Sequence, residues 1–343
     1  MSENEHRYVV GVDGGGTKTI AVIAGLDGQV LGYGRAGNCD IYANPHAVDE
    51  VELAVMRACA AANITAADLS AAAYSLCGCD WPEDFAFWQE ELSKRELGQT
   101  LRVVNDAVGA LSSDVPDGNA IVIICGTGAA IGSRNEVGQV WHSSFWQLRQ
   151  GGAEMSHAAL ELIYRAELGI DPPTSLTERA LGYFGMESAE QLLHTFTGRD
   201  QAQPSYVPGL MPLIFDEADA GDLAATRLLA DYGAAYAEIA IAAARKVGIV
   251  GKPINLLLAG GVFRHPSQIL RKRIIDDLHA AMPQITVVPS RSEPVKGAIT
   301  IALQMLDVRV DDHVEERLTS TMPPPEFFHT LVALSDAHSE PQP

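Results

Sequence analysis

The chain has 343 residues, of which 47% are hydrophobic, and a formal net charge of -20 at pH 7. This length and hydrophobic content predict a globular protein with a sizeable core and two domains. The negative charge would repel a phosphate backbone and no large lysine and arginine cluster interrupts it, so we expect no nucleic-acid partner. A polar N-terminus and the absence of an apolar run of about 18 residues predict a cytoplasmic protein with no membrane contact.

The first third of the sequence predicts an antiparallel meander followed by alternating helices and strands. Apolar runs predict strands at Tyr8–Asp13, Thr19–Ala24, Gln29–Gly34, Ala71–Cys77 and Leu101–Val104. Helical spacing of apolar residues predicts helices over Val48–Ala62 and Glu83–Ser93.

The second half of the sequence repeats the first, with a long helical region added. Strands are predicted at Ala120–Cys125, Ala129–Arg134, Val137–Trp141, Ile254–Ala259 and Ile285–Val288. Helices are predicted most clearly at Asp222–Val247, Pro266–Ala281 and Ala298–Leu306, the last opened by Pro294 to Gly297. Beyond Asp307 the composition is polar and rich in proline, which predicts a flexible or loosely docked tail in which Phe327 and Phe328 dock onto the body, onto a second subunit or onto nothing.

Five cysteines are spread over separate predicted elements. An odd number in a chain of this size argues against a disulfide framework. The pair Cys77 and Cys79 could suggest a metal site, but it lacks zinc-ligand spacing and partner ligands. Thiols that are buried or half-buried at a strand end are the favoured interpretation.

The most informative motif joins the first two predicted strands, where Asp13 is followed by Gly14, Gly15, Gly16, Thr17 and Lys18. Glycines let the backbone turn tightly and approach a ligand closely, and exposed N–H groups with a threonine hydroxyl can donate to phosphate oxygens. The motif is neither the P-loop nor the dinucleotide turn, and a strand rather than a helix follows it. It therefore indicates a hairpin phosphate loop, the alternative being an ordinary glycine-rich turn.

Two further glycine turns follow apolar strands in the second half. The first contains Gly126, Thr127 and Gly128, and the second contains Gly260 and Gly261. Between the first two glycine turns of the chain, Asn105 and Asp106 stand where a strand ends and a helix begins.

Together these motifs resemble the BadF/BadG/BcrA/BcrD-type ATPase family, and within it the N-acetylglucosamine kinase-like branch of the actin/hexokinase/Hsp70 superfamily, over roughly residues 8 to 305. The segments that carry the resemblance are Gly11–Thr19, Asn105–Ala107, Cys125–Gly128, Leu258–Phe263 and Pro294–Ala298. The resemblance implies an α/β fold of two ribonuclease H-like domains around a nucleotide cleft. Expected boundaries are 1–115 for the first domain and 116–306 for the second, with a helical insertion at about 154–248, a last helix that packs back on the first domain, and a tail at 307–343.

The resemblance also implies which residues bind ATP and Mg²⁺. The nucleotide contacts would come from Asp13, Gly14, Gly15, Gly16, Thr17, Lys18, Gly126, Thr127, Gly128, Gly260 and Gly261. Asp13 would hold a hydrated Mg²⁺ beside the phosphates. We assign no catalytic role to Lys18, because its side chain would point away from the loop if the following strand keeps its alternation.

Asp106 matches the segment that carries the catalytic acid of the family. Transfer of a phosphoryl group to an alcohol needs in-line positioning, charge stabilisation on the phosphate oxygens and a base near the hydroxyl. A positioned carboxylate such as Asp106 can accept that proton. The alternative is that Asp106 only caps a helix.

The acceptor loop departs from the family pattern. In the sugar-kinase branch an acid stands where this chain has Ala153, whereas Glu154 and Ser156 are in register. Because alanine accepts no hydrogen bond from its side chain, an amino-sugar substrate is open to question. We assign acceptor contacts to Asn38, Asn105, Asp106, Gly152 and Glu154, with Asp40 and Asn44 as further candidates. A pocket for a larger or acidic sugar could be lined by Trp141, Phe145, Trp146 and Arg149.

Three functions remain open. The first and favoured one is an ATP-dependent kinase that phosphorylates a hydroxyl of a sugar, with N-acetylglucosamine, glucosamine or a related sugar as the acceptor. The second is an ATPase that drives a partner enzyme, against which the lack of paired cysteines near Asp106 argues. The third is a sugar- or nucleotide-binding regulator that has lost turnover. A homodimer is compatible with such folds, although the sequence has no interface signature.

Overall fold

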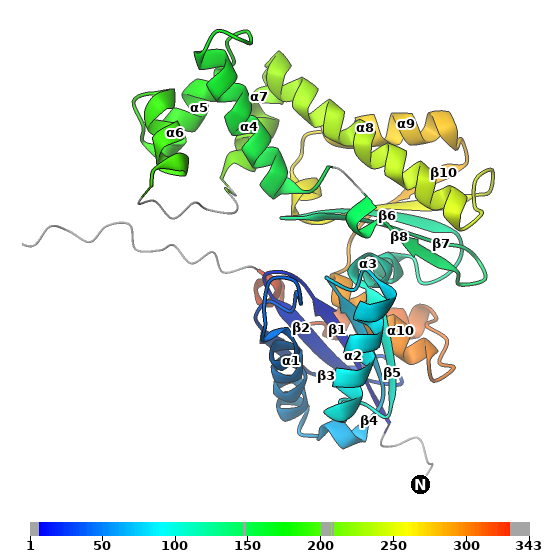
Figure 1. Cartoon of the computed structure of the whole chain (residues 1–343). Coiled ribbons are helices and arrows are strands. Elements are labelled where there is room, and N and C mark those ends of the chain that lie inside the picture. Colours follow the sequence, from blue (N-terminus) through cyan, green and yellow to red (C-terminus); the bar gives the residue numbers. More distant parts are fainter. Residues whose placement is uncertain (1–6, 147–148, 200–206, 208, 330–343) are drawn as a thin grey trace, which may run out of the picture. The chain divides into compact units, whose positions relative to one another are not determined.

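The protein is described here from a computed structural model, in residues 7–146, 149–199, 207 and 209–329. The chain divides into two compact units (Figure 1). Unit 1 contains residues up to Val104 together with those from Ala298 onward, and unit 2 contains Asn105–Gly297. The domain boundaries at 115/116 and 306/307 stay predictions.

Unit 1 is built on a five-stranded sheet in the order β3-β2-β1-β4-β5. Its strands are β1 (Tyr8–Gly14), β2 (Thr19–Gly25), β3 (Val30–Ala36), β4 (Leu69–Leu76) and β5 (Thr100–Asn105). β1 pairs antiparallel with β2 and parallel with β4, and β2 pairs antiparallel with β3. The central strand β1 is apolar because its valines are fully buried within the unit.

Unit 2 contains a second five-stranded sheet, in the order β10-β9-β6-β7-β8. Its strands are β6 (Ala120–Cys125), β7 (Ala129–Arg134), β8 (Val140–His142), β9 (Ile254–Ala259) and β10 (Ile285–Val288). β6 pairs antiparallel with β7 and parallel with β9, and β7 pairs antiparallel with β8. The strand order of this sheet, and the parallel and antiparallel pairings of its central strand β6, repeat those of the first sheet around β1. The α/β class and the internal repeat predicted from the sequence are therefore confirmed.

Unit 1 contains three α-helices and two short 3-10 helices besides the part of α10 that belongs to it, among the residues that the structure describes. They are α1 (Ala47–Ala62), η1 (Ala66–Asp68), α2 (Pro82–Lys94), α11 (Asp312–Thr321) and η4 (Pro325–Phe328). α1 lies directly against β3, where a Cβ on Gly34 would come within 2.2 Å of the Ala54 carbonyl oxygen. Helix α10 (Pro294–Gln304) crosses the boundary between the units, and its second half packs against β1, because a Cβ on Gly11 would meet the Ile299 nitrogen at 2.3 Å.

Among the described residues of unit 2, five α-helices lie between β8 and β9, where a single α-helix separates β3 from β4 in unit 1. They are α4 (Gly152–Glu167), α5 (Ser175–Phe184), α6 (Ala189–Thr197), α7 (Leu210–Asp219) and α8 (Leu223–Lys246), and the unit also contains α3 (Asp106–Asp114), η2 (Ser144–Trp146), η3 (Gly261–Arg264) and α9 (Ile269–Ala281). Figure 1 shows α8 alongside α9, with α4 to α7 grouped beyond one end of α8. One core joins these helices to the second sheet, and Met155, Tyr232 and Tyr236 are fully buried in it.

Three predicted elements begin at positions that differ from the prediction by about three or four residues. The third strand of the repeat begins at Val140 rather than at residue 137, because Asn135 and Gly138 form a turn in which Gly138 has a φ of 81°. Helix α9 begins at Ile269 rather than at Pro266. Helix α10 already begins at Pro294, as the fixed φ of proline allows at a first helical position, and ends at Gln304.

The expectation of a flexible or loosely docked tail was wrong as far as His329, whereas the alternative that Phe327 and Phe328 dock onto the body was confirmed. Helix α11 and the turn η4 pack on the body of unit 1, where Leu318 is fully buried and Phe328 is 7% exposed. Phe327 meets Tyr33 of β3 with its ring edge-on, at a centroid distance of 4.7 Å. The rest of the predicted tail, residues 330–343, lies outside the described residues.

The cysteines are all thiols, as the sequence predicted. Cys77 is half-buried and the other four are buried. Within the part of the chain that the structure describes, no helix is both long and apolar enough to cross a membrane.

Candidate functional site

The first glycine turn joins β1 to β2 in unit 1. The Gly15 N–H donates to the Lys18 carbonyl at 2.9 Å and closes the turn, which leaves Gly16 and Thr17 exposed at its tip. A Cβ on Gly14 would lie 2.3 Å from the Cys39 sulfur, so packing alone requires glycine there. A Cβ on Gly16 would meet nothing within 4 Å.

The loop after β3 is tied to this turn. The Cys39 N–H donates to the Gly15 carbonyl at 3.2 Å, and Asn38 lies directly beside this link. The Asn38 side chain accepts from the Asp40 N–H at 2.7 Å, which fixes a local turn. Asn38 and Asp40 are therefore held next to the first glycine turn, as an acceptor contact would require.

The second and third glycine turns lie side by side in unit 2. They follow β6 and β9, which are parallel neighbours with Ile124 opposite Ala259. A Cβ on Gly260 would come within 2.4 Å of the Cys125 carbonyl oxygen, and the φ of Gly260 is 99°. This close backbone contact holds the third turn on the second.

For several glycines in these turns, neither the backbone conformation nor a neighbour among the described residues requires glycine. Their φ angles are outside the left-handed region, and a Cβ would meet nothing within 4 Å, at Gly16, Gly126, Gly128 and Gly261. Gly182 in α5 has the same property, so open space alone does not mark a site. Four such glycines in three strand-end turns do favour close approach of a ligand to exposed backbone.

The N-terminus of α4 is hydrogen-bonded to the second glycine turn. The N–H groups of Gly152 and Ala153 donate to the carbonyls of Gly126 and Thr127 at 2.8 and 3.0 Å. A Cβ on Gly151 would lie 2.2 Å from the Gly128 carbonyl oxygen. Sequence reasoning considered only the missing side-chain acid at Ala153 and missed this backbone role, for which the glycine pair before a predicted helix was the available signal.

Glu154, in the first turn of α4, lies in a charged cluster. Its carboxylate pairs with Arg149 at 3.2 Å and also accepts the Gln150 N–H. The Arg149 guanidinium stands over the Tyr232 ring, 5.1 Å from the ring centroid, and the hydrogen bond with Glu154 raises the pKa of Arg149. A hydroxyl of a substrate would therefore compete with Arg149 for the Glu154 carboxylate.

The aromatic residues predicted for the acceptor pocket lie near this cluster in sequence and are largely exposed. Phe145 is 59% exposed and Trp146 is 67% exposed, whereas Trp141 packs against the core. Gln147 and Leu148 of the same loop lie outside the described residues.

Asp106 is the first residue of α3 and is half-buried. The N-cap is Asn105, whose side chain is 4% exposed and accepts from the Ala107 N–H at 3.0 Å. The Asp106 carboxylate accepts from the same N–H at 2.9 Å, so it supplements a cap that Asn105 already provides. A capping role alone therefore gives little reason for a carboxylate at Asp106.

The contacts of helix α3 with β7 fix the direction of its N-terminus. Its first turn lies on β7, where a Cβ on Gly132 would meet the Ala107 Cβ at 3.0 Å. Its last turn lies by Arg134, which donates to Ser112 and to the Val115 carbonyl. Because Gly132 is nearer to the β6–β7 turn than Arg134 is, the N-terminus of α3 points toward that turn.

The predicted site residues thus form two groups, one in each unit. Unit 1 holds the loop of Asn38 against the first glycine turn, and unit 2 holds the α4 N-terminus against the second, which lies beside the third. Asp106 stands at the N-terminus of α3. The Lys18 amine donates to the Phe328 carbonyl of η4, a contact that sequence reasoning did not foresee.

Asp13 is the residue predicted to bind Mg²⁺, and it is half-buried at the end of β1 beside the first turn. Among the described residues no three histidine, cysteine, aspartate or glutamate side chains form a metal-binding group. Mg²⁺ at a phosphate site is held by one or two carboxylates, water and the phosphates themselves, so a single carboxylate beside the turn fits this ion.

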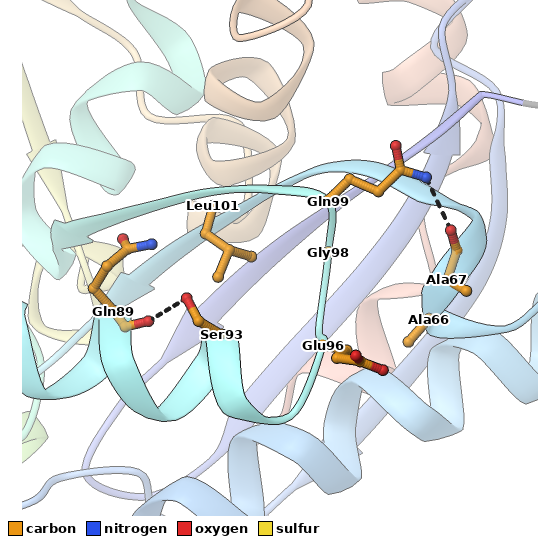
Figure 2. A pocket seen from close by; sticks show the side chains of 8 residues that line it. All are labelled: Ala66, Ala67, Gln89, Ser93, Glu96, Gly98, Gln99 and Leu101. Atoms are coloured by element: carbon orange, nitrogen blue, oxygen red, sulfur yellow. Dashed lines mark hydrogen bonds between the residues drawn. The ribbon is translucent and has the colours of Figure 1, made fainter.

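A cavity of about 480 Å³ lies elsewhere in unit 1 (Figure 2). It is lined by residues of η1, α2, the loop that follows α2 and the start of β5, among them Ala67, Gln89 and Glu96. The residues of η1 precede β4, so this cavity lies at the amino end of β4. The first glycine turn follows the carboxyl end of β1, which runs parallel to β4, so the two features lie at opposite ends of these strands. It is therefore separate from the candidate site.

Comparison with known proteins gives a consistent result. A model of the BadF/BadG/BcrA/BcrD ATPase family matches residues 10–302. The N-acetylmuramic acid/N-acetylglucosamine kinase of Clostridium acetobutylicum is 24% identical over 309 residues, which are 88% of this chain and all of that protein. The N-acetyl-D-glucosamine kinase of Dictyostelium discoideum is 26% identical over 321 residues, 86% of this chain and 97% of that protein.

The fold has also been seen in a solved structure. A candidate N-acetylglucosamine kinase from Chromobacterium violaceum superimposes with a TM-score of 0.65 at 24% identity, covering 87% of this chain and 99% of the other. This likeness shows a shared fold.

Proposed function

Because the chain belongs to the BadF/BadG/BcrA/BcrD ATPase family, we propose that it is an ATP-dependent kinase that phosphorylates a hydroxyl of a sugar, with N-acetylglucosamine, glucosamine or a related sugar as acceptor. The observation that carries the proposal is the set of open glycines at the three strand-end turns, and the position of Asp106 at the N-terminus of α3 supports it. The names of the two curated relatives support a sugar as the acceptor.

ATP would be held by backbone donors. In this proposal the turns at Gly14–Thr17 and Gly126–Gly128 donate to the phosphates, and Gly260 with Gly261 lies against the adenosine. Lys18 adds a positive charge next to the first turn. Asp13 would hold Mg²⁺ through water, and the ion would neutralise charge on the phosphate oxygens.

Asp106 would act as the general base. The acceptor hydroxyl passes its proton to the Asp106 carboxylate as its oxygen forms a bond to the γ-phosphorus. The bond between the γ-phosphorus and the bridging oxygen breaks, and ADP leaves with that oxygen. The acceptor would be placed by Asn38, Asn105, Gly152 and Glu154, and the missing acid at Ala153 leaves the Glu154 carboxylate with a larger share of sugar recognition.

A substitution in the first turn tests the nucleotide assignment. Gly16→Ala fits the chain without a clash, so the free energy of unfolding should change by no more than about 0.5 kcal/mol. The added methyl group would stand where a phosphate approaches and should raise the Kd for ATP about tenfold. Calorimetric titration with MgATP and a thermal melt measure the two effects. An unchanged Kd would show that no ligand approaches this glycine.

The acceptor class is tested by Mg²⁺- and ATP-dependent ADP release against hexoses, amino sugars, N-acetylated sugars and acidic sugars. Release that rises sharply with one sugar class supports the kinase. Slow release that no sugar changes would favour the ATPase that drives a partner enzyme. Tight nucleotide binding without release would favour the binding regulator.

A cytoplasmic location, a lack of nucleic-acid partners and a homodimeric state are further parts of this proposal. The net charge of -20 supports the second of them. Gel filtration with light scattering would determine the oligomeric state.

A further inference from the structure

We infer that the C-terminal segment Asp311–His329 positions the first glycine turn for nucleotide binding by holding Lys18. The inference rests on the proposed use of that turn for ATP. The segment lies beyond the range matched by the family model, which ends at residue 302.

The first part of the segment is fixed along the edge of the sheet of unit 1. Thr321 of α11 accepts from the Val30 N–H at 3.0 Å, at the start of β3. Arg317 of α11 donates to Gln29 at 2.6 Å and pairs with Asp27 at 3.1 Å. A Cβ on Gly28 would lie 2.6 Å from the Val314 carbonyl oxygen, so α11 touches the β2–β3 turn directly.

The last part of the segment runs toward the opposite end of β3. Arg35, near the end of β3, donates to the carbonyls of Phe327 and His329 at 3.1 and 2.7 Å. The Phe327 ring packs on Tyr33, and the Phe328 side chain is buried. These contacts present the Phe328 carbonyl to the Lys18 amine, which donates to it.

Lys18 is thereby restrained at two points. Its backbone carbonyl accepts from the Gly15 N–H at 2.9 Å and closes the glycine turn, while its ammonium group is held by the Phe328 carbonyl. The unrestrained side chain of a lysine populates many rotamers, and fixing it beforehand removes that cost from the binding step. The C-terminal segment would therefore order both the turn and the positive charge beside it before ATP arrives.

A different role would be purely structural, because a segment that covers the edge strand β3 also stabilises unit 1 and blocks pairing with other chains. The two roles predict different affinities for MgATP when η4 is removed: the positioning role predicts a higher Kd, and the structural role predicts an unchanged Kd. We propose to compare a chain that ends at Pro324, which lacks η4 and keeps α11, with a matched control that ends at His329, which keeps every described contact.

The readouts are the Kd for MgATP by calorimetry and the melting temperature. The chain that ends at Pro324 and the full-length Lys18→Met variant should each bind MgATP about tenfold more weakly, the loss expected for one charge-assisted hydrogen bond. The two changes together should cost no more than Lys18→Met alone, because that variant already removes the contact with Phe328 together with the charge. Lys18→Arg keeps a donor and should restore most of the affinity, and the control that ends at His329 should bind like the full chain.

The inference is overturned if loss of η4 lowers the melting temperature but leaves the Kd for MgATP unchanged. It is also overturned if the truncated chain that carries Lys18→Met raises this Kd by the product of the two single fold-changes. The calorimetric measurement needs no sugar. If the full chain binds MgATP but phosphorylates no sugar, the proposed kinase activity fails and the inference can still be tested by the Kd values. A full chain that binds no nucleotide would overturn both.

Discussion

Asp106→Asn is expected to lower kcat for sugar phosphorylation by a factor of about 10²–10⁴, the contribution of a positioned general base. Asparagine has nearly the same shape, and its carbonyl oxygen can still accept from the Ala107 N–H. Asn105 continues to cap α3, so the fold and the Kd for ATP should change little. Steady-state kinetics of ADP release, together with calorimetry, separate turnover from binding.

Asp114→Asn provides a matched control at the other end of the same helix. The Asp114 carboxylate accepts from the Ser292 hydroxyl at 2.7 Å and from the N–H groups of Arg291 and Ser292. Its loss should lower the free energy of unfolding by about 1 kcal/mol and leave kcat near the normal value. Equal turnover in Asp106→Asn and the unchanged protein would remove Asp106 from the mechanism, whatever the control does.

Gly260→Ala is expected to have the largest effect on stability among the turn substitutions. The new Cβ would come within 2.4 Å of the Cys125 carbonyl oxygen, and alanine is strained at a φ of 99°. The two effects together should lower the free energy of unfolding by about 3 kcal/mol. Chemical denaturation measures this loss.

The neighbouring Gly261→Ala serves as the comparison, since its Cβ meets nothing within 4 Å and its φ is ordinary. We expect it to keep normal stability and to raise the Kd for ATP. If Gly261→Ala instead unfolds the protein while Gly260→Ala is tolerated, the division of these turns into packing glycines and ligand-facing glycines is wrong.

The parts of the fold that the sequence predicted well are those set by short-range patterns. A strand such as β6 is an uninterrupted apolar run that ends in a glycine turn, and both signals lie within ten residues of each other. The same run of strands occurs twice, which made the repeat of the two sheets predictable before any pairing was known.

Docking of Phe327 and Phe328 onto the body was only one of three alternatives, and helix α11 was not predicted, because the partners of the C-terminal segment are distant in sequence. Its polar, proline-rich composition is typical of a flexible tail, yet it contacts β3 nearly 300 residues away, as in the Val30–Thr321 hydrogen bond with a separation of 291. A local pattern contains no information about such a partner. For the same reason the anchoring of Lys18 by Phe328 could not be foreseen.

The candidate site shows a second limit, which concerns backbone roles. Sequence reasoning treated Ala153 as a missing acid, because a motif is read by its side chains. In the fold its N–H holds the Thr127 carbonyl, a function that any residue except proline can perform. The residue assignments of the site therefore stay predictions that the variants above can test.

Phosphorus NMR of the purified protein with MgATP and N-acetylglucosamine is the most direct test of the central claim, transfer of the γ-phosphoryl group to a sugar hydroxyl. We expect a new phosphomonoester signal that grows in step with ADP and is absent with Asp106→Asn. ADP that appears together with inorganic phosphate, and without a phosphomonoester for any sugar offered, would contradict the claim.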